Sequence, residues 1–258
     1  MYLPIKPQRS CAAAWVEAFA AVDGEQGREA HNVIIDIAEP LTVSAADERI
    51  INLADGFLRQ HEKLPVQAVA NTIFPEALYT RFGAPAFIEK FHAEILPKIR
   101  RTNRWSGYYF ERMTAYPTQG GDPLNQLWGI VERIRDEANR SLNKFELSLF
   151  DPERDIDNSP YGGQCLSFLS FKLLPGTEKK LALTAMYRNH YYIEKLLGNL
   201  VGLGRLMGFI ANEGGIGVGS LTVISTHAVI DKPRTAQRSD VNDLLATCQA
   251  AQTESEAA

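Results

Sequence analysis

One stretch of the chain, residues 160–231, constrains the fold more than any other. Alternating apolar residues predict two neighbouring strands, at 166–174 and 180–187. A long helix is predicted at 191–212 and a further strand at 221–230. Strands that alternate with a helix in this way predict an α/β protein.

The predicted helix at 191–212 combines an apolar stripe with several glycines. The stripe consists of Ile193, Leu196, Leu197, Leu200, Leu203, Met207 and Ile210. The glycines are Gly198, Gly202, Gly204 and Gly208. Because each Gly costs a helix about 1 kcal/mol relative to Ala, we expect this helix to lie close against another backbone.

The rest of the chain shows further helical and extended patterns. Helices are predicted at 10–22, 44–61, 65–79, 86–99 and 124–135, with a short one at 241–248. Strands are predicted at 32–37 and 144–150. We expect residues 1–233 to form one domain and residues 234–258 to form a tail that is partly disordered.

Composition excludes some classes of partner. The 258 residues are 45% apolar and carry a formal net charge of -4, which argues against a nucleic-acid polymer as partner. A nucleotide monomer remains possible because a few arginines suffice for one phosphate. The N-terminus has no secretion-signal pattern, and no segment has about 18 consecutive apolar residues. We therefore expect a cytoplasmic protein with no membrane partner.

Cys165 is the candidate nucleophile. It follows a Gly-rich segment at the start of the first predicted strand, and Arg188 ends the second. A nearby guanidinium lowers the pKa of a thiol. The alternative role is that of a small buried hydrophobe, which is common for free cysteines and is our expectation for Cys11 and Cys248. The wide spacing of the three cysteines suits a reducing compartment.

Several segments, taken in order, resemble those of a known enzyme family. Residues 76–83 are similar to its Glu-Leu-Leu-Trp-Phe-Leu-x-Gly segment. Residues 106–117 are similar to its Gly-x-x-Tyr-Gly-x-Gln-Trp-Arg-x-Trp segment, and residues 125–127 to the Asp-Gln-Leu that follows. Cys165 stands where the family has Pro-Cys-His.

The second half of the resemblance lies beyond Cys165. Met186-Tyr187-Arg188 is similar to Met-Tyr-Gln-Arg-Ser with one residue missing. Asn199 stands in the place of the Asn in Phe-Asn-Ile-Ala, and His227 in that of the His in His-x-Tyr. Over roughly residues 28–231 the chain thus resembles the folate-dependent thymidylate synthase superfamily.

The resemblance implies an architecture and an assembly. Its fold is an α/β (α+β) single domain with a mixed, twisted sheet of about six strands and helices on one face. The other face of the sheet packs against a twin subunit, so the resemblance implies a homodimer. Such an interface also accounts for strands that are apolar on both faces.

The resemblance also implies the chemistry. A thiolate at Cys165 would add to carbon 6 of a pyrimidine nucleoside monophosphate, which makes carbon 5 nucleophilic enough to attack a one-carbon donor. That donor would be 5,10-methylenetetrahydrofolate. Arg188 would lower the thiol pKa, and Glu76 would act as general acid and base through ordered water.

Substrate binding is implied at five further positions. Arg28 and Arg140 would bind the phosphate together with Arg188, with some of these arginines supplied by the partner subunit. Asn199 would pair with the N3–H and O4 of uracil, since it has both a carbonyl and an amide. His227 would reach a sugar hydroxyl, and Tyr109 belongs to the aromatic binding segment.

The chain departs from the family pattern at several places. Leu166 replaces the His beside the reactive Cys, and Val229 replaces the Tyr that holds the sugar 3'-hydroxyl. Tyr191 stands near the position of an expected Asp that serves folate binding. Methylation and hydroxymethylation therefore both remain open. The competing hypothesis is a catalytically silent member that binds a nucleotide as a sensor or partner protein.

Overall fold

The computed structural model describes residues 2–100, 108–153, 155–156 and 164–256. A seven-stranded mixed sheet runs through these residues, in the order β1-β2-β7-β5-β4-β3 with β6 paired to β7. The strands are β1 (Leu3–Pro4), β2 (Glu29–Ile37), β3 (Phe145–Ser148), β4 (Leu166–Leu174), β5 (Lys180–Tyr187), β6 (His190–Tyr191) and β7 (Gly217–Val229). The predicted α/β class is confirmed. The strands not expected from the sequence are the two-residue strands β1 and β6.

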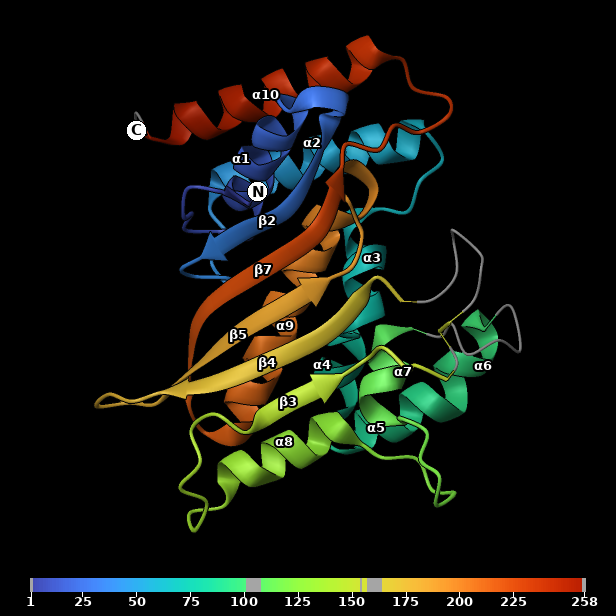
Figure 1. Ribbon diagram of the computed structural model, residues 1–258, viewed down its shortest axis with the longest axis vertical. Helices are drawn as coiled ribbons and strands as arrows, with labels where there is room; N and C mark the ends of the chain where they lie inside the picture. Colours follow the sequence, from blue (N-terminus) through green and yellow to red (C-terminus); the bar gives the residue numbers. More distant parts are fainter. Residues whose placement is uncertain (1, 101–107, 154, 157–163, 257–258) are drawn as a thin grey trace.

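Helices account for most of the remaining described chain. The α-helices are α1 (Cys11–Asp23), α2 (Ala45–Gln60), α3 (Val66–Ile73), α4 (Glu76–Phe82), α5 (Ala86–Lys90), α6 (Leu96–Ile99), α7 (Tyr109–Thr114), α8 (Gln126–Arg135), α9 (Leu197–Gly214) and α10 (Arg238–Glu256). A 3₁₀ turn, η1 (Gln26–Arg28), precedes β2, and two π-helical turns, η2 (Phe91–Ile95) and η3 (Tyr192–Leu196), lead into α6 and α9. Figure 1 shows α9 behind β5 and β7, and α10 across one end of the molecule beside α1 and α2.

The central strands join through one hairpin and one crossover. Strands β4 and β5 pair antiparallel, with Phe171 opposite Leu183. Strand β5 then pairs parallel with β7, and η3 and α9 form the connection between them. Such a crossover requires a helix packed on the sheet, which is the place that α9 takes. The carboxyl end of β5 and the start of η3 therefore lie close to the start of β4.

Helix α9 makes the close backbone contact that its glycines predict. A Cβ at Gly198 would lie 2.5 Å from the Val69 Cβ and 2.8 Å from the Val66 carbonyl oxygen, both in α3. A Cβ at Gly202 would lie 2.8 Å from the Ala70 carbonyl oxygen. The expectation of close packing is confirmed, and α3 is the neighbour. This contact positions α3 beside the residues at the start of α9.

Two predicted helices in the first half of the chain differ from the structure. The segment predicted as one helix at 65–79 is divided into α3 and α4, and Pro75 lies at the break. Pro lacks the amide hydrogen that a continuing helix needs. The segment predicted at 86–99 is interrupted by η2, a π-helical turn that apolar periodicity does not reveal.

The C-terminal segment forms a longer helix than the predicted 241–248. Helix α10 packs against α2 and α1 and buries Val241, Leu244, Cys248 and Ala251. These residues recur at helical spacing, so the apolar stripe continues past the predicted end. In the part of the chain that the structure describes, no helix has the combined length and apolar character needed to cross a bilayer.

Candidate functional site

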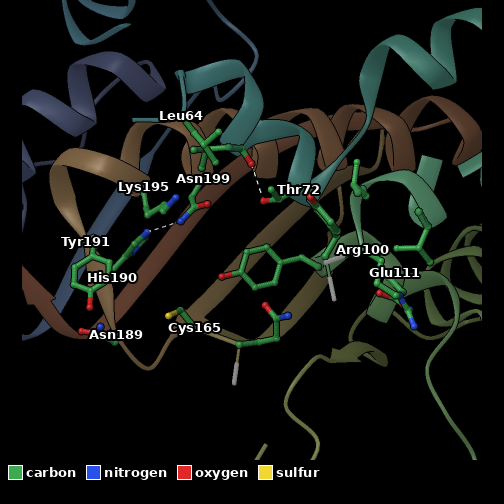
Figure 2. A pocket seen from close by; sticks show the side chains of 16 residues that line it. Leu64, Thr72, Arg100, Glu111, Cys165, Asn189, His190, Tyr191, Lys195 and Asn199 are labelled. Atoms are coloured by element: carbon green, nitrogen blue, oxygen red, sulfur yellow. Dashed lines mark hydrogen bonds and ion pairs between the residues drawn. The ribbon is translucent and has the colours of Figure 1, made fainter. Parts of the chain in front are cut away.

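A cavity of about 440 Å³ lies beside the start of β4, between α3, α7 and the start of α9 (Figure 2). Its polar and reactive side chains are those of Thr72, Arg100, Tyr108, Tyr109, Glu111, Gln164, Cys165, Asn189, His190, Tyr191, Lys195 and Asn199. The apolar residues Leu64, Val69, Leu96 and Ile99 also line it. Its volume and mixed lining are typical of a site for a small molecule.

Cys165 brings a half-buried free thiol to this cavity from the residue that precedes β4. The β4–β5 pairing holds it near Arg188, whose backbone N–H donates to the Cys165 carbonyl at 2.9 Å. The Arg188 Nε donates to the Gln164 carbonyl at 3.0 Å. Burial raises the pKa of the Cys165 thiol, and the charges of Arg188 and Lys195 oppose that rise. Ionisation of the thiol therefore depends on these two cations.

Lys195 reaches the cavity from η3. The Asp231 carboxylate anchors this turn, since it accepts hydrogen bonds from the backbone N–H groups of Ile193 (2.8 Å) and Glu194 (3.2 Å). Within the described ranges, no carboxylate pairs with the Lys195 ammonium. Lys195 can therefore place a positive charge beside both the thiol and a bound anion.

Tyr109 begins α7 and lies near Cys165. Its hydroxyl oxygen accepts a hydrogen bond from the Leu166 backbone N–H at 3.4 Å. Burial raises the pKa of Tyr109, and the neighbouring Cys165 thiol raises it further. The phenol therefore keeps its proton at neutral pH and can donate a hydrogen bond.

Asn199 presents a buried carboxamide to the cavity from α9. It is 3% exposed, and its Nδ2 lies 2.9 Å from the Nε2 of His190, which also lines the cavity. Figure 2 shows the carboxamide oxygen of Asn199 turned away from His190. Asn199 therefore has an acceptor and a donor available for the edge of a planar ring.

Glu111 is the carboxylate that lines this cavity among the described residues. It is 3% exposed, and one of its oxygens is paired with Arg100. Its other oxygen, Oε2, is buried and has no hydrogen-bond partner in the described part of the chain. A buried carboxylate oxygen without a partner is costly, so a ligand or water with an available hydrogen would be bound favourably there.

Glu76 lies elsewhere, contrary to the role that the sequence suggested for it. It begins α4, its side chain is 49% exposed, and it lines a second cavity, where it forms an ion pair with Arg205 at 2.9 Å. The break at Pro75 starts a new helix, so Glu76 does not continue the face of α3 that lines the first cavity. Thr72 is the polar residue of α3 that does so.

The structure places two of the predicted phosphate ligands outside the cavity of their own chain. Arg28 ends η1 and lies 3.5 Å from Asp23. Arg140 lies in the connection between α8 and β3, where the Leu142 carbonyl accepts a hydrogen bond from the Leu173 N–H at 2.8 Å. Leu173 is at the opposite end of β4 from Cys165. Arg140 is therefore remote from the thiol within one chain.

His227 lies next to the cavity and not in its lining. Its Nδ1 is 2.7 Å from the Oδ1 of Asn189, which does line the cavity. Its Nε2 is 3.3 Å from the Glu29 carboxylate. His227 can therefore act on a ligand only through Asn189 or after a side-chain shift.

Sequence reasoning missed nine of the twelve polar and reactive cavity residues, and the charged or ionisable ones that matter most here are Glu111, Arg100, Lys195 and His190. Lys195 and His190 stand a few positions beyond Arg188, where the family resemblance is local and incomplete. Glu111 gave no signal, because an acidic residue on a short helix ordinarily faces solvent. No three His, Cys, Asp or Glu side chains among the described residues are arranged to hold a metal ion.

Comparisons with known proteins give two relatives among the archaea. A protein of Methanothermobacter marburgensis named "putative thymidylate synthase" is 25% identical over 209 residues, which cover 80% of this chain and 79% of that protein. A protein of Methanocaldococcus jannaschii with the same name is 28% identical over 135 residues, covering 50% of this chain and 58% of that protein. No family model matches the chain. The two relatives support a relationship to the thymidylate synthase superfamily at a distance that specifies no activity.

Proposed function

We propose that this protein transfers a one-carbon unit to carbon 5 of a pyrimidine nucleoside monophosphate, through covalent addition of Cys165 to carbon 6. One observation carries the proposal. The half-buried Cys165 thiol lies in a small-molecule cavity with Asn199 and Tyr109, and with the charges of Arg188 and Lys195 acting on it. A cysteine that served only the core would need none of these polar neighbours.

Binding begins with the base and the phosphate. Asn199 offers its carboxamide to the ring edge, which suits the N3–H and O4 of uracil. Arg188 and Lys195 attract the phosphate and also favour the thiolate of Cys165. The thiolate then adds to carbon 6, and the electron pair of the carbon 5–carbon 6 double bond moves to form an enolate through carbon 4 and O4.

Protons must be moved at two places. Tyr109 keeps its phenolic proton, so it can donate a hydrogen bond near Cys165 as charge develops on the base. The hydrogen on carbon 5 has to be removed before the thiolate can leave carbon 6. We assign this removal to Glu111, acting directly or through water, because it is the described carboxylate in the cavity and one of its oxygens has no partner.

The expected folate suits the apolar part of the cavity lining. Leu64, Leu96 and Ile99 contribute apolar side chains to it, which suits a flat ring system. When bound, 5,10-methylenetetrahydrofolate would supply the one-carbon unit. Methylation and hydroxymethylation both follow from the same residues, since they differ in whether a hydride or water completes the reaction.

We also propose that the protein acts as a homodimer through the sheet face opposite α9. Phe168, Met186, Ile224 and Ile34 lie side by side across β4, β5, β7 and β2. Met186 is 38% exposed, and the other three are partly buried. A second copy would cover this apolar row. It would also allow Arg140 of the partner subunit to reach a phosphate that the chain's own Arg140 cannot.

The test is the release of tritium from carbon 5 of labelled UMP and dUMP, with and without methylenetetrahydrofolate. Wild-type protein should release tritium from one of the two, and Cys165→Ala should release none while still binding that nucleotide. Nucleotide binding without release from the wild type would refute the transfer and favour a silent nucleotide-binding protein. Equal release by Cys165→Ala would refute covalent addition.

A further inference from the structure

His190 is an almost fully buried histidine that the proposed reaction leaves without a role. It lies in β6, is 1% exposed and lines the cavity. Its ring stacks on that of Tyr187, with 3.9 Å between centroids and an angle of 12° between planes. The stacking and the burial together hold the imidazole in one position.

Both ring nitrogens of His190 are engaged. Nε2 lies 2.9 Å from the Nδ2 of Asn199, and Nδ1 lies 3.0 Å from the Oγ of Ser225. The Tyr192 hydroxyl also donates to this Oγ, at 3.3 Å. Burial lowers the pKa of His190 to about 3, so the ring is neutral at physiological pH. An amide nitrogen can only donate, so Nε2 accepts from Asn199 and Nδ1 carries the proton that it donates to Ser225.

This arrangement couples the orientation of the Asn199 carboxamide to the tautomer of His190. The oxygen and nitrogen of a carboxamide are similar in size, so packing alone discriminates poorly between the two orientations. The acceptor at Nε2 of His190 holds the nitrogen on one side, and Oδ1 points away from His190 (Figure 2). One N–H of Asn199 is used on His190, which leaves Oδ1 and the second N–H for a ligand.

We propose that His190 is a positioning residue that favours uracil over cytosine, because it presents the oxygen of Asn199 to the N3 position of the base. This inference rests on the proposed function and deepens it. Uracil has a hydrogen on N3 and an acceptor at position 4, whereas cytosine has an acceptor at N3 and a donor at position 4. An Asn199 oxygen facing N3 accepts from uracil and repels cytosine.

The test measures binding of UMP, dUMP, CMP and dCMP by calorimetry, so it needs no turnover. Wild type should bind the uracil nucleotide more tightly than the cytosine nucleotide with the same sugar. His190→Leu keeps similar bulk and removes the acceptor, so the ratio of the two affinities should fall about tenfold. The matched control is His61→Leu, since His61 is also buried and bonded to a hydroxyl, that of Thr235 at 3.0 Å. It should leave the ratio unchanged.

A second variant covers the case in which His190→Leu does not fold. Ser225→Ala keeps His190 but removes the acceptor for its Nδ1 proton, so the tautomer is no longer held and the ratio should fall several-fold. An unchanged ratio in a folded His190→Leu protein, or in Ser225→Ala if the former does not fold, would overturn the inference. Selective uracil binding without tritium release would refute only the transfer reaction. Binding of neither base by the wild type would overturn both.

Discussion

The three cysteines of this chain differ in what surrounds them. Cys11 is buried, and its thiol donates to the Pro40 carbonyl at 3.3 Å. Burial raises the pKa of Cys11 and of the buried Cys248 to about 12. Burial raises the pKa of Cys165 as well, but there two cations oppose the rise. The thiolate fraction of Cys165 therefore increases with pH and increases further wherever those cations come closer.

At the residue scale, we predict opposite effects on activity for substitutions of the two carboxylates Glu111 and Glu76. Glu111→Gln should lower kcat for one-carbon transfer about 100-fold or more with little change in nucleotide affinity, because it removes the base in the cavity. Glu76→Gln is the matched control and should stay within a few-fold of wild type, since Glu76 is half-exposed and paired with Arg205 outside the cavity. Steady-state kinetics of both variants show which of the two carboxylates takes part in the reaction. A large loss in Glu76→Gln with none in Glu111→Gln would contradict the assignment.

Sequence reasoning anticipated part of the cavity, placed one residue elsewhere and missed others, for different reasons. Cys165 and Asn199 line the cavity together because strand and helix periodicity preserve spacing along the β4–β5–α9 unit, and Tyr109 of α7 joins them. Glu76 was assigned from the resemblance of residues 76–83, and this segment begins a new helix after Pro75, so a match in sequence does not predict which cavity its side chain faces. The position of the Glu111 side chain depends on a tertiary contact with Arg100, which no local sequence pattern predicts.

At the element scale, the contact between α3 and α9 determines how closely two walls of the cavity approach. Val69 and Thr72 of α3 and Asn199 of α9 all line it. The backbones approach closely because Gly198 and Gly202 carry no Cβ. Periodicity and glycine content predicted this packing. They could not predict the π-helical turn η3, which shifts the side chains before α9 by a residue and brings Lys195 to the cavity.

Two glycines of α9 make a matched pair for testing this contact. Gly198→Ala should destabilise the protein by roughly 2 kcal/mol, because its Cβ would meet the Val66 and Val69 atoms of α3. Gly208→Ala should be neutral or stabilise by up to about 1 kcal/mol. Its Cβ would meet only the side chain of Leu41, at 3.2 Å, and Leu41 is 49% exposed and free to move. Urea unfolding at one pH gives both values, and equal stability of the two variants would rule out the packing argument.

At the scale of the whole molecule, Arg140 lies far from the cavity of its own chain. The β3–β4 pairing places the α8–β3 connection at the end of the sheet opposite Cys165. A single chain therefore cannot bring Arg140 to its own thiol without unfolding β3. In the proposed homodimer, each cavity would be completed by Arg140 of the partner subunit.

Mixing two inactive variants tests this shared site. Cys165→Ala and Arg140→Ala, each inactive or weak alone, should regain about a quarter of wild-type activity after unfolding and refolding together, because half the dimers are mixed and each contains one intact site. Cys165→Ala mixed with Asn199→Ala is the control. Both of those residues line the same chain's cavity, so no activity should return. Recovery in the control, or none in the test pair, would argue against an Arg140 shared between subunits.

The burial of Cys11 and Cys248 has a practical consequence for any such experiment. Of its three thiols, the unmodified chain presents one to a water-soluble alkylating reagent, and that thiol is in the candidate site. The molar ratio of label to protein therefore gives the fraction of molecules with a correctly formed cavity in each preparation. Because one thiol reacts, the amount of bound label gives the concentration of intact sites. Every turnover number can then be expressed per intact site without engineering the protein.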